Sequence, residues 1–93
     1  MRVSKEEINY IKSTILLADP SAKVFLFGSR TNDQLKGGDI DLLVFSQHIN
    51  LSVKRQVRIK LNDVLGEQKI DIVVARDTQK PFIKFICQNA IEL

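Results

Sequence analysis

The sequence contains 93 residues, of which 44% are hydrophobic and 27% charged, and its formal net charge is +3. This composition is typical of a small globular protein with one core, so we predict a single domain over residues 1–93. No apolar run approaches the roughly 20 residues that a membrane-spanning helix needs, and we expect no membrane partner. The charged start of the chain and its single cysteine, Cys87, favour a cytoplasmic protein. The modest positive charge permits a phosphate-bearing ligand but gives no clear sign of nucleic acid binding.

The first half of the chain predicts one helix followed by two strands. Ser4 and Glu7 form a capping-box pattern, and isoleucines then recur at helical spacing until an Asp-Pro pair ends the helix. Short apolar runs at 24–27 and 40–45 predict buried strands. The polar segment 28–38 between them contains three of the four glycines, so we predict a loop there.

The second half predicts a helix, a third strand and a final helix. The first of these helices ends at Gly66, and its core side is marked by Val53, Val57, Leu61 and Val64. Residues 69–75, KIDIVVA, predict the strand, and the last helix should begin near residues 78–81. The core side of this last helix is predicted to consist of Phe82, Phe85, Ile86 and Ala90. Together these elements predict an α+β fold, a small mixed sheet of three to four strands with helices packed on it.

Three aspartates fall on the predicted strands, where aspartate is disfavoured. Side chains alternate along a strand, so Asp39 and Asp41 should point to the same face, opposite to the apolar residues between and after them. Asp71 alternates with isoleucines in the same way and should enter the same cleft. Aspartates on the exposed edge of a sheet need no ligand, but three of them on one small sheet favour a bound cation. Carboxylate oxygens are typical ligands of Mg²⁺.

Gly28 and Ser29 follow the first predicted strand directly. A glycine lets the backbone approach a phosphate closely, although a Gly-Ser pair is also common in tight turns. The pair becomes more informative because the next strand carries two of the aspartates. Phosphate donors beside metal-binding carboxylates describe a site for a metal-bound nucleoside triphosphate.

The stretch FGSR, followed by residues up to Gly38 and then DIDLLVF, resembles the signature of the minimal nucleotidyltransferases of the DNA polymerase beta superfamily. KIDIVV is similar to the strand of that family that carries the third carboxylate. The spacing from Ser29 to Asp39, with nine residues between them, is one residue shorter than the family's most common spacing.

The resemblance implies a nucleotidyltransferase fold and roles for six residues. Gly28, Ser29 and Arg30 would bind the triphosphate of ATP, whereas Asp39, Asp41 and Asp71 would be catalytic residues and ligands of two Mg²⁺ ions. The third aspartate would also orient or deprotonate the incoming hydroxyl. The implied reaction transfers AMP, or another NMP, from the nucleoside triphosphate to that hydroxyl.

The acceptor is expected to belong to another protein, because 93 residues leave little room for an acceptor-binding domain. In the minimal branch the resemblance implies an antitoxin that pairs with a helical HEPN-type toxin and adds AMP to one of its tyrosines. The alternative is a non-catalytic binding module that keeps the fold and neutralises its partner sterically. The sequence leaves oligomerisation open.

Other reactive residue types have simpler interpretations. His48 is the only histidine and is expected in a solvated turn, so we do not expect a Ser-His-Asp triad built on Ser29. Cys87 lies among apolar residues of the last predicted helix and is expected to be a small core residue.

Overall fold

The computed structural model describes residues 3–28, 39–66 and 68–93. Its elements in chain order are α1 (Lys5–Ala18), β1 (Lys23–Phe27), β2 (Ile40–Phe45), α2 (Leu51–Leu65), β3 (Ile70–Ala75), α3 (Pro81–Cys87) and β4 (Ile91–Glu92). The strands form one sheet in the order β3-β2-β1-β4, in which β2 and β3 are parallel and the other pairs antiparallel. The predicted α+β fold with a small mixed sheet is confirmed. Among the helices described, none has both the length and the apolar character needed to cross a membrane.

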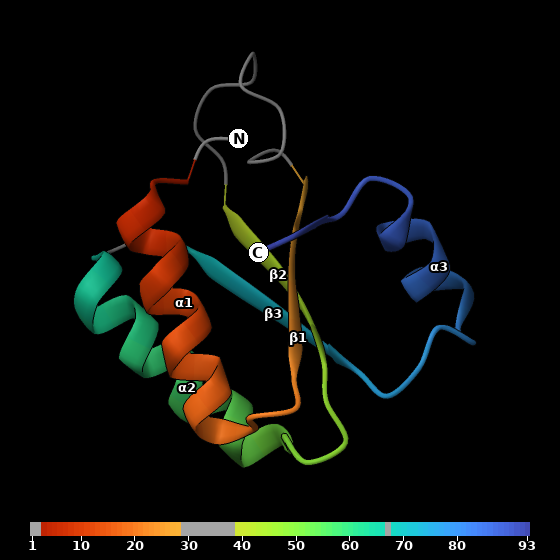
Figure 1. The fold of residues 1–93 in the computed structure, drawn as a ribbon, viewed down its shortest axis with the longest axis horizontal. Helices are drawn as coiled ribbons and strands as arrows, with labels where there is room; N and C mark the ends of the chain where they lie inside the picture. Colours follow the sequence, from red (N-terminus) through yellow and green to blue (C-terminus); the bar gives the residue numbers. More distant parts are fainter. Residues whose placement is uncertain (1–2, 29–38, 67) are drawn as a thin grey trace.

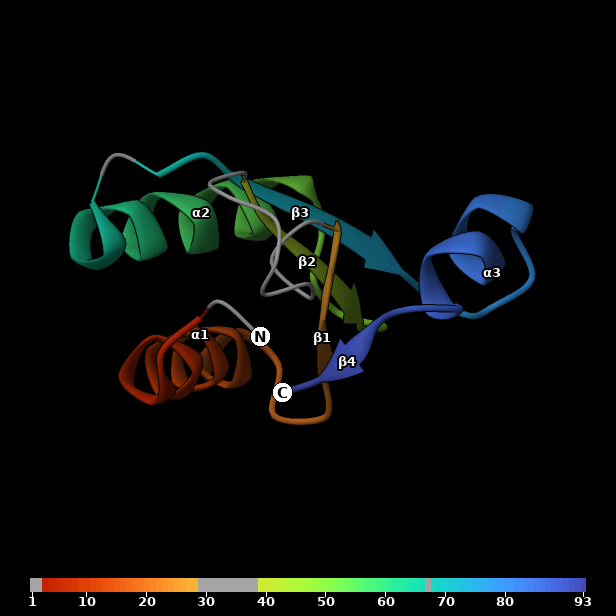
Figure 2. The same ribbon diagram turned by 90° about the horizontal axis from the view of Figure 1, so that it is seen from above.

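The sheet separates two layers of helix (Figures 1 and 2). Helices α1 and α2 lie together on one face, and α3 lies on the other. The main core fills the space between the sheet and the α1–α2 pair, and its fully buried members are Ile11, Ile15, Leu26, Ile40, Leu42, Val44 and Leu61. A smaller cluster under α3 consists of Leu43, Ala75, Ile83 and Ile86. Both β2 and β3 contribute to the two clusters, and β2 lies between β3 and β1 in the sheet.

Helix α1 begins and ends where the sequence predicts. The Ser4 side chain accepts a hydrogen bond from the backbone N–H of Glu7 at 3.1 Å, and the Glu7 carboxylate accepts one from the backbone N–H of Ser4 at 2.9 Å. This capping box satisfies two backbone donors that the first turn would otherwise leave free. The Asp19 backbone N–H caps the other end by donating to the Ile15 carbonyl.

Helix α2 confirms the predicted end at Gly66 but not the whole predicted core side. Gly66 has a φ of +85°, a conformation that favours glycine, and its N–H donates to the Asn62 carbonyl. Val57 and Leu61 are buried, yet Val64 is 58% exposed and Leu65 packs on the core instead. Positions 64 and 65 follow Leu61 by three and four residues, so helical spacing allows either to face the core.

Helix α3 buries a different face from the one predicted, turned by one residue position. Phe82 and Phe85 are 59% and 70% exposed, whereas Ile83 and Ile86 are buried against the sheet. Both pairs have the same three-residue spacing, so periodicity cannot distinguish them. Ala90 lies beyond the end of the helix at Cys87, and the following residues form β4 along β1. The prediction of Phe82, Phe85 and Ala90 as core residues was therefore wrong, and Ile86 is the member that is buried.

Candidate active site

The three predicted aspartates come together at one end of β2 and β3. Asp41 and Asp71 are direct neighbours in the register of these parallel strands, and Asp39 lies immediately before β2 rather than within it. One carboxylate oxygen from each residue lies within 4.8 Å of the others, and all three side chains are half-buried. We call these three residues the acidic cluster.

The apolar residues of both strands explain why the carboxylates share one side. Ile40 and Leu42 are completely buried in the main core, and Ile70 is 3% exposed beside them. Because side chains alternate along each strand, anchoring these residues under α1 and α2 directs Asp41 and Asp71 to the opposite face of the sheet. The predicted alternation is therefore confirmed, and the third aspartate enters the same space as the first two.

The electrostatics of the acidic cluster favour a cation. Partial burial raises the pKa of Asp41 above its usual range, and the neighbouring charges of Asp71 and Asp39 raise it further. Lys69 opposes this shift of the Asp41 pKa. Its ammonium lies 3.6 Å from Asp39 Oδ2 and 4.0 Å from Asp71 Oδ2.

Sequence reasoning missed Lys69 as part of the site. Lys69 precedes Asp71 by two residues, which places the two side chains on the same face of an extended segment. This spacing was the available signal, but it becomes informative only once the strand pairing is known. In the structure the Ile40 N–H donates to the Lys69 carbonyl at 2.9 Å. This hydrogen bond fixes the backbone of Lys69 opposite the start of β2.

Gly28 lies directly against the acidic cluster. It has a φ of +80°, and a Cβ built on it would clash with Asp41 Oδ2 and would lie only 3.2 Å from Asp41 Cγ. Only glycine fits this position, both because of its backbone conformation and because of the space available. The end of β1 is thus brought next to the carboxylates, as the predicted phosphate site requires. Ser29 and Arg30, the other predicted phosphate ligands, lie outside the described residues.

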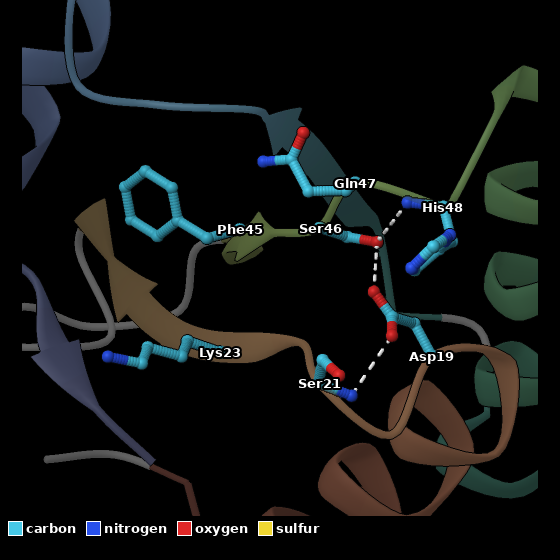
Figure 3. A pocket seen from close by; sticks show the side chains of 7 residues that line it. All are labelled: Asp19, Ser21, Lys23, Phe45, Ser46, Gln47 and His48. Carbon is cyan, nitrogen blue, oxygen red and sulfur yellow. Dashed lines mark hydrogen bonds between the residues drawn. The ribbon is translucent and has the colours of Figure 1, made fainter.

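A second polar cluster lies at the opposite end of β2, around a hollow of about 190 Å³ (Figure 3). Asp19, only 2% exposed, accepts hydrogen bonds from the Ser46 hydroxyl and from the Ser21 backbone N–H. The Ser46 oxygen in turn accepts from the backbone N–H groups of His48 and Ile49 at 3.1 and 3.0 Å. These bonds tie the end of α1 to the end of β2.

The presence of Asp19, Ser46 and His48 in one place does not make a catalytic triad. The Ser46 hydroxyl donates to the carboxylate itself, and histidine contributes its backbone N–H to the serine oxygen. A nucleophilic serine requires a base that takes its proton, in turn oriented by a third group, and this arrangement is different. His48 is exposed, in agreement with the predicted solvated histidine. We interpret the second polar cluster as structural.

Comparison with known families agrees with the fold. The family model described as Polymerase beta, Nucleotidyltransferase matches residues 9–93. This match covers most of the chain, including all three aspartates, and defines the protein as a transferase of the nucleotidyltransferase class. The chain belongs to the polymerase beta nucleotidyltransferase family, so a nucleoside triphosphate is the implied substrate. A search of curated proteins gave no significant match.

Proposed function

We propose that this protein transfers AMP, or another NMP, from a nucleoside triphosphate to a hydroxyl group of a partner protein. The observation that carries the proposal is the acidic cluster, in which Asp41 of β2, Asp71 of β3 and Asp39 just before β2 each bring one carboxylate oxygen within 4.8 Å of the others. Such a concentration of like charge is unfavourable without a cation. ATP is the donor that we propose first.

The chemistry of the acidic cluster fits a hard divalent cation such as Mg²⁺. Asp39, Asp41 and Asp71 offer only oxygen ligands, and the raised pKa of Asp41 reflects a surplus of negative charge that a cation would neutralise. We propose that these three residues hold two Mg²⁺ ions. When bound, the ions would activate the acceptor hydroxyl and stabilise charge on the phosphates.

The residues of the chain then have distinct roles. Gly28 lets the end of β1 lie directly against the Asp41 carboxylate, and we propose that Gly28, Ser29 and Arg30 contact the triphosphate. Asp71 accepts the proton of the attacking hydroxyl. A bond forms between the hydroxyl oxygen and the α-phosphorus, the bond from that phosphorus to the bridging oxygen breaks, and pyrophosphate leaves.

The proposed acceptor is a tyrosine hydroxyl on a HEPN-type toxin, which would make this protein its antitoxin. The resemblance to minimal nucleotidyltransferases supports this partner. The structure supports a protein acceptor in a further respect, since Phe82 and Phe85 are exposed on the helix that packs on the same face of the sheet as Asp41. Exposed aromatic residues are enriched in protein interfaces.

A label-transfer assay tests the proposal. The protein is incubated with ATP labelled at the α-phosphate, Mg²⁺ and a HEPN-type protein as acceptor, and incorporation of AMP is followed by mass spectrometry. Asp71→Asn should keep most of the ATP affinity, because two carboxylates remain, while transfer falls by about 10² to 10⁴ through loss of the base. Asp63→Asn, an exposed aspartate on α2, is the matched control and should transfer normally.

The same assay separates enzyme from steric inhibitor. If chemistry is the function, Asp71→Asn should bind the partner but neither modify nor neutralise it. Full neutralisation without incorporation would refute the proposal and leave a non-catalytic binding module.

A further inference from the structure

Lys69 is the cation closest to the acidic cluster in the described part of the chain, and its position is set by the sheet. Its backbone carbonyl accepts from the Ile40 N–H, so Lys69 stands opposite Asp39, two residues ahead of the paired Asp41 and Asp71. Asp39 and Lys69 therefore place opposite charges side by side. Asp41 and Asp71, the next pair on the same face of the sheet, place two like charges side by side.

The Lys69 side chain is held by weak ion pairs and can move away from the acidic cluster. Its side chain is 70% exposed, and its distances of 3.6 and 4.0 Å to Asp39 and Asp71 are those of ion pairs rather than short hydrogen bonds. Exposed ion pairs of this kind are weak and screened by salt. A long flexible lysine can thus neutralise part of the cluster without locking it.

One ammonium cannot neutralise three carboxylates. With Lys69 in place the four groups keep a formal charge of −2 when all three aspartates are ionised. A divalent cation can supply the missing charge, but it must approach the carboxylates of Asp39 and Asp71, which the ammonium also faces. Like charges repel, so the ammonium and the divalent cation compete for one place.

We infer that Lys69 is a tethered counter-ion of the acidic cluster, which weakens binding of a divalent cation until a nucleotide is present. The inference rests on the proposed function, since it takes the cluster to be the metal site. A triphosphate entering beside Gly28 offers the ammonium a second set of negative oxygens, so Lys69 can turn from the carboxylates to the phosphates as the cation enters. Lys69 is thus a positioning residue that couples metal binding to nucleotide binding.

Binding of Mn²⁺ to the nucleotide-free protein, measured by titration calorimetry, tests the competition. Lys69→Gln should bind Mn²⁺ about three- to tenfold more tightly than wild type, the range expected for two exposed ion pairs. Lys84→Gln, on α3, removes the same charge elsewhere and should bind as wild type does. Lys69→Arg keeps the charge and should also bind as wild type does. With ATP present, the difference between Lys69→Gln and wild type should shrink.

A second measurement needs neither metal nor nucleotide. In EDTA, Lys69→Gln should lower the Tm more than Lys84→Gln, because the acidic cluster loses its counter-ion. When Asp39→Asn and Asp71→Asn are also present, Lys69→Gln should lower the Tm no more than Lys84→Gln does.

The outcomes distinguish failure of the inference from failure of the proposed function. If wild type binds Mn²⁺ and Lys69→Gln binds it no more tightly, the inference is overturned and the proposed function stands. An equal loss of Tm with and without the two aspartate substitutions also overturns the inference. If neither protein binds Mn²⁺, with or without ATP, the metal site itself is refuted, and with it the proposed function.

Discussion

The side chain of Asp41 occupies the space in which any residue other than glycine at position 28 would place its Cβ. Gly28→Ala should therefore move the Asp41 carboxylate and strain the backbone at once. We expect a loss of stability of about 1 to 3 kcal/mol from the positive φ, and a fall in nucleotidyl transfer of about 10²-fold from the displaced carboxylate. Calorimetric binding of Mn²⁺ and ATP, together with thermal melting, checks both effects.

Gly66 provides the matched control for this substitution. Its φ of +85° is close to the +80° of Gly28, but nothing lies within 4 Å of a Cβ built on it. Gly66→Ala should lose stability from the same kind of strain and keep its affinity for metal and nucleotide. Equal binding by Gly28→Ala and Gly66→Ala would show that the contact with Asp41 has no functional role.

The raised pKa of Asp41 predicts a pH dependence of stability in metal-free protein. A carboxyl whose folded pKa lies above its unfolded value of 3.8 stabilises the fold when protonated and loses this contribution as pH rises through the folded pKa. Asp41→Asn removes the titration. The free energy of unfolding of wild type relative to Asp41→Asn should thus fall as pH rises from below 3.8, and become constant above the folded pKa. Urea unfolding in EDTA across this range measures it, and a difference that does not vary with pH would contradict the prediction.

Asp19 should make the fold more stable as pH rises, the opposite of the effect expected for Asp41. The hydrogen bond from Ser46 lowers the pKa of Asp19, so its ionised form stabilises the fold above pH 3.8, and this contribution is lost as pH falls through the lower folded pKa. Asp19→Asn should have a lower Tm than wild type at pH 7, and the difference in Tm should become smaller at acidic pH. Because this side chain lies at the other end of β2 from the acidic cluster, ATP affinity should not change. A large loss of affinity in the folded variant would mean that the second polar cluster takes part in function.

The orientation of α3 predicts that substitutions at two adjacent residues change stability by very different amounts. Ile86 is buried, so Ile86→Ala should cost about 2 to 5 kcal/mol of stability. Phe85 is 70% exposed, and Phe85→Ala should change stability by no more than about 0.5 kcal/mol. Urea unfolding compares the two variants. If Phe85→Ala lost more stability than Ile86→Ala, the helix would pack on the sheet through its phenylalanines.

The sequence predicts most strongly where local signals and burial agree. In α1, the capping box and the isoleucine spacing predict the same helix, and in β2 the bounds are those of the apolar run. The gathering of the aspartates also follows from alternation, because a buried Ile40 leaves Asp39 and Asp41 only one direction in which to point.

The predictions fail where the choice depends on contacts between distant segments. Nothing local distinguishes Phe85 from Ile86 as a core residue, since the space under α3 is set by Leu43 and Ala75 of the sheet. The role of Lys69 requires the register of β2 and β3, which places it opposite Asp39. β4 is two residues long and has no pattern of its own, so only its pairing with β1 defines it.

Strand β2 has a hydrogen-bonded neighbour on each side, whereas β4 is a short strand at the edge of the sheet. Amide protons of residues 42–44 should therefore exchange with solvent only when the whole domain opens, and those of β4 should exchange through local fraying. Asp41 lies on the slowly exchanging strand. Asp71 lies on β3, on the side of β2 away from β4. Asp41 and Asp71 can thus keep their spacing while the β4 edge opens, which would let an arriving partner reshape that edge without disturbing the proposed site of nucleotidyl transfer.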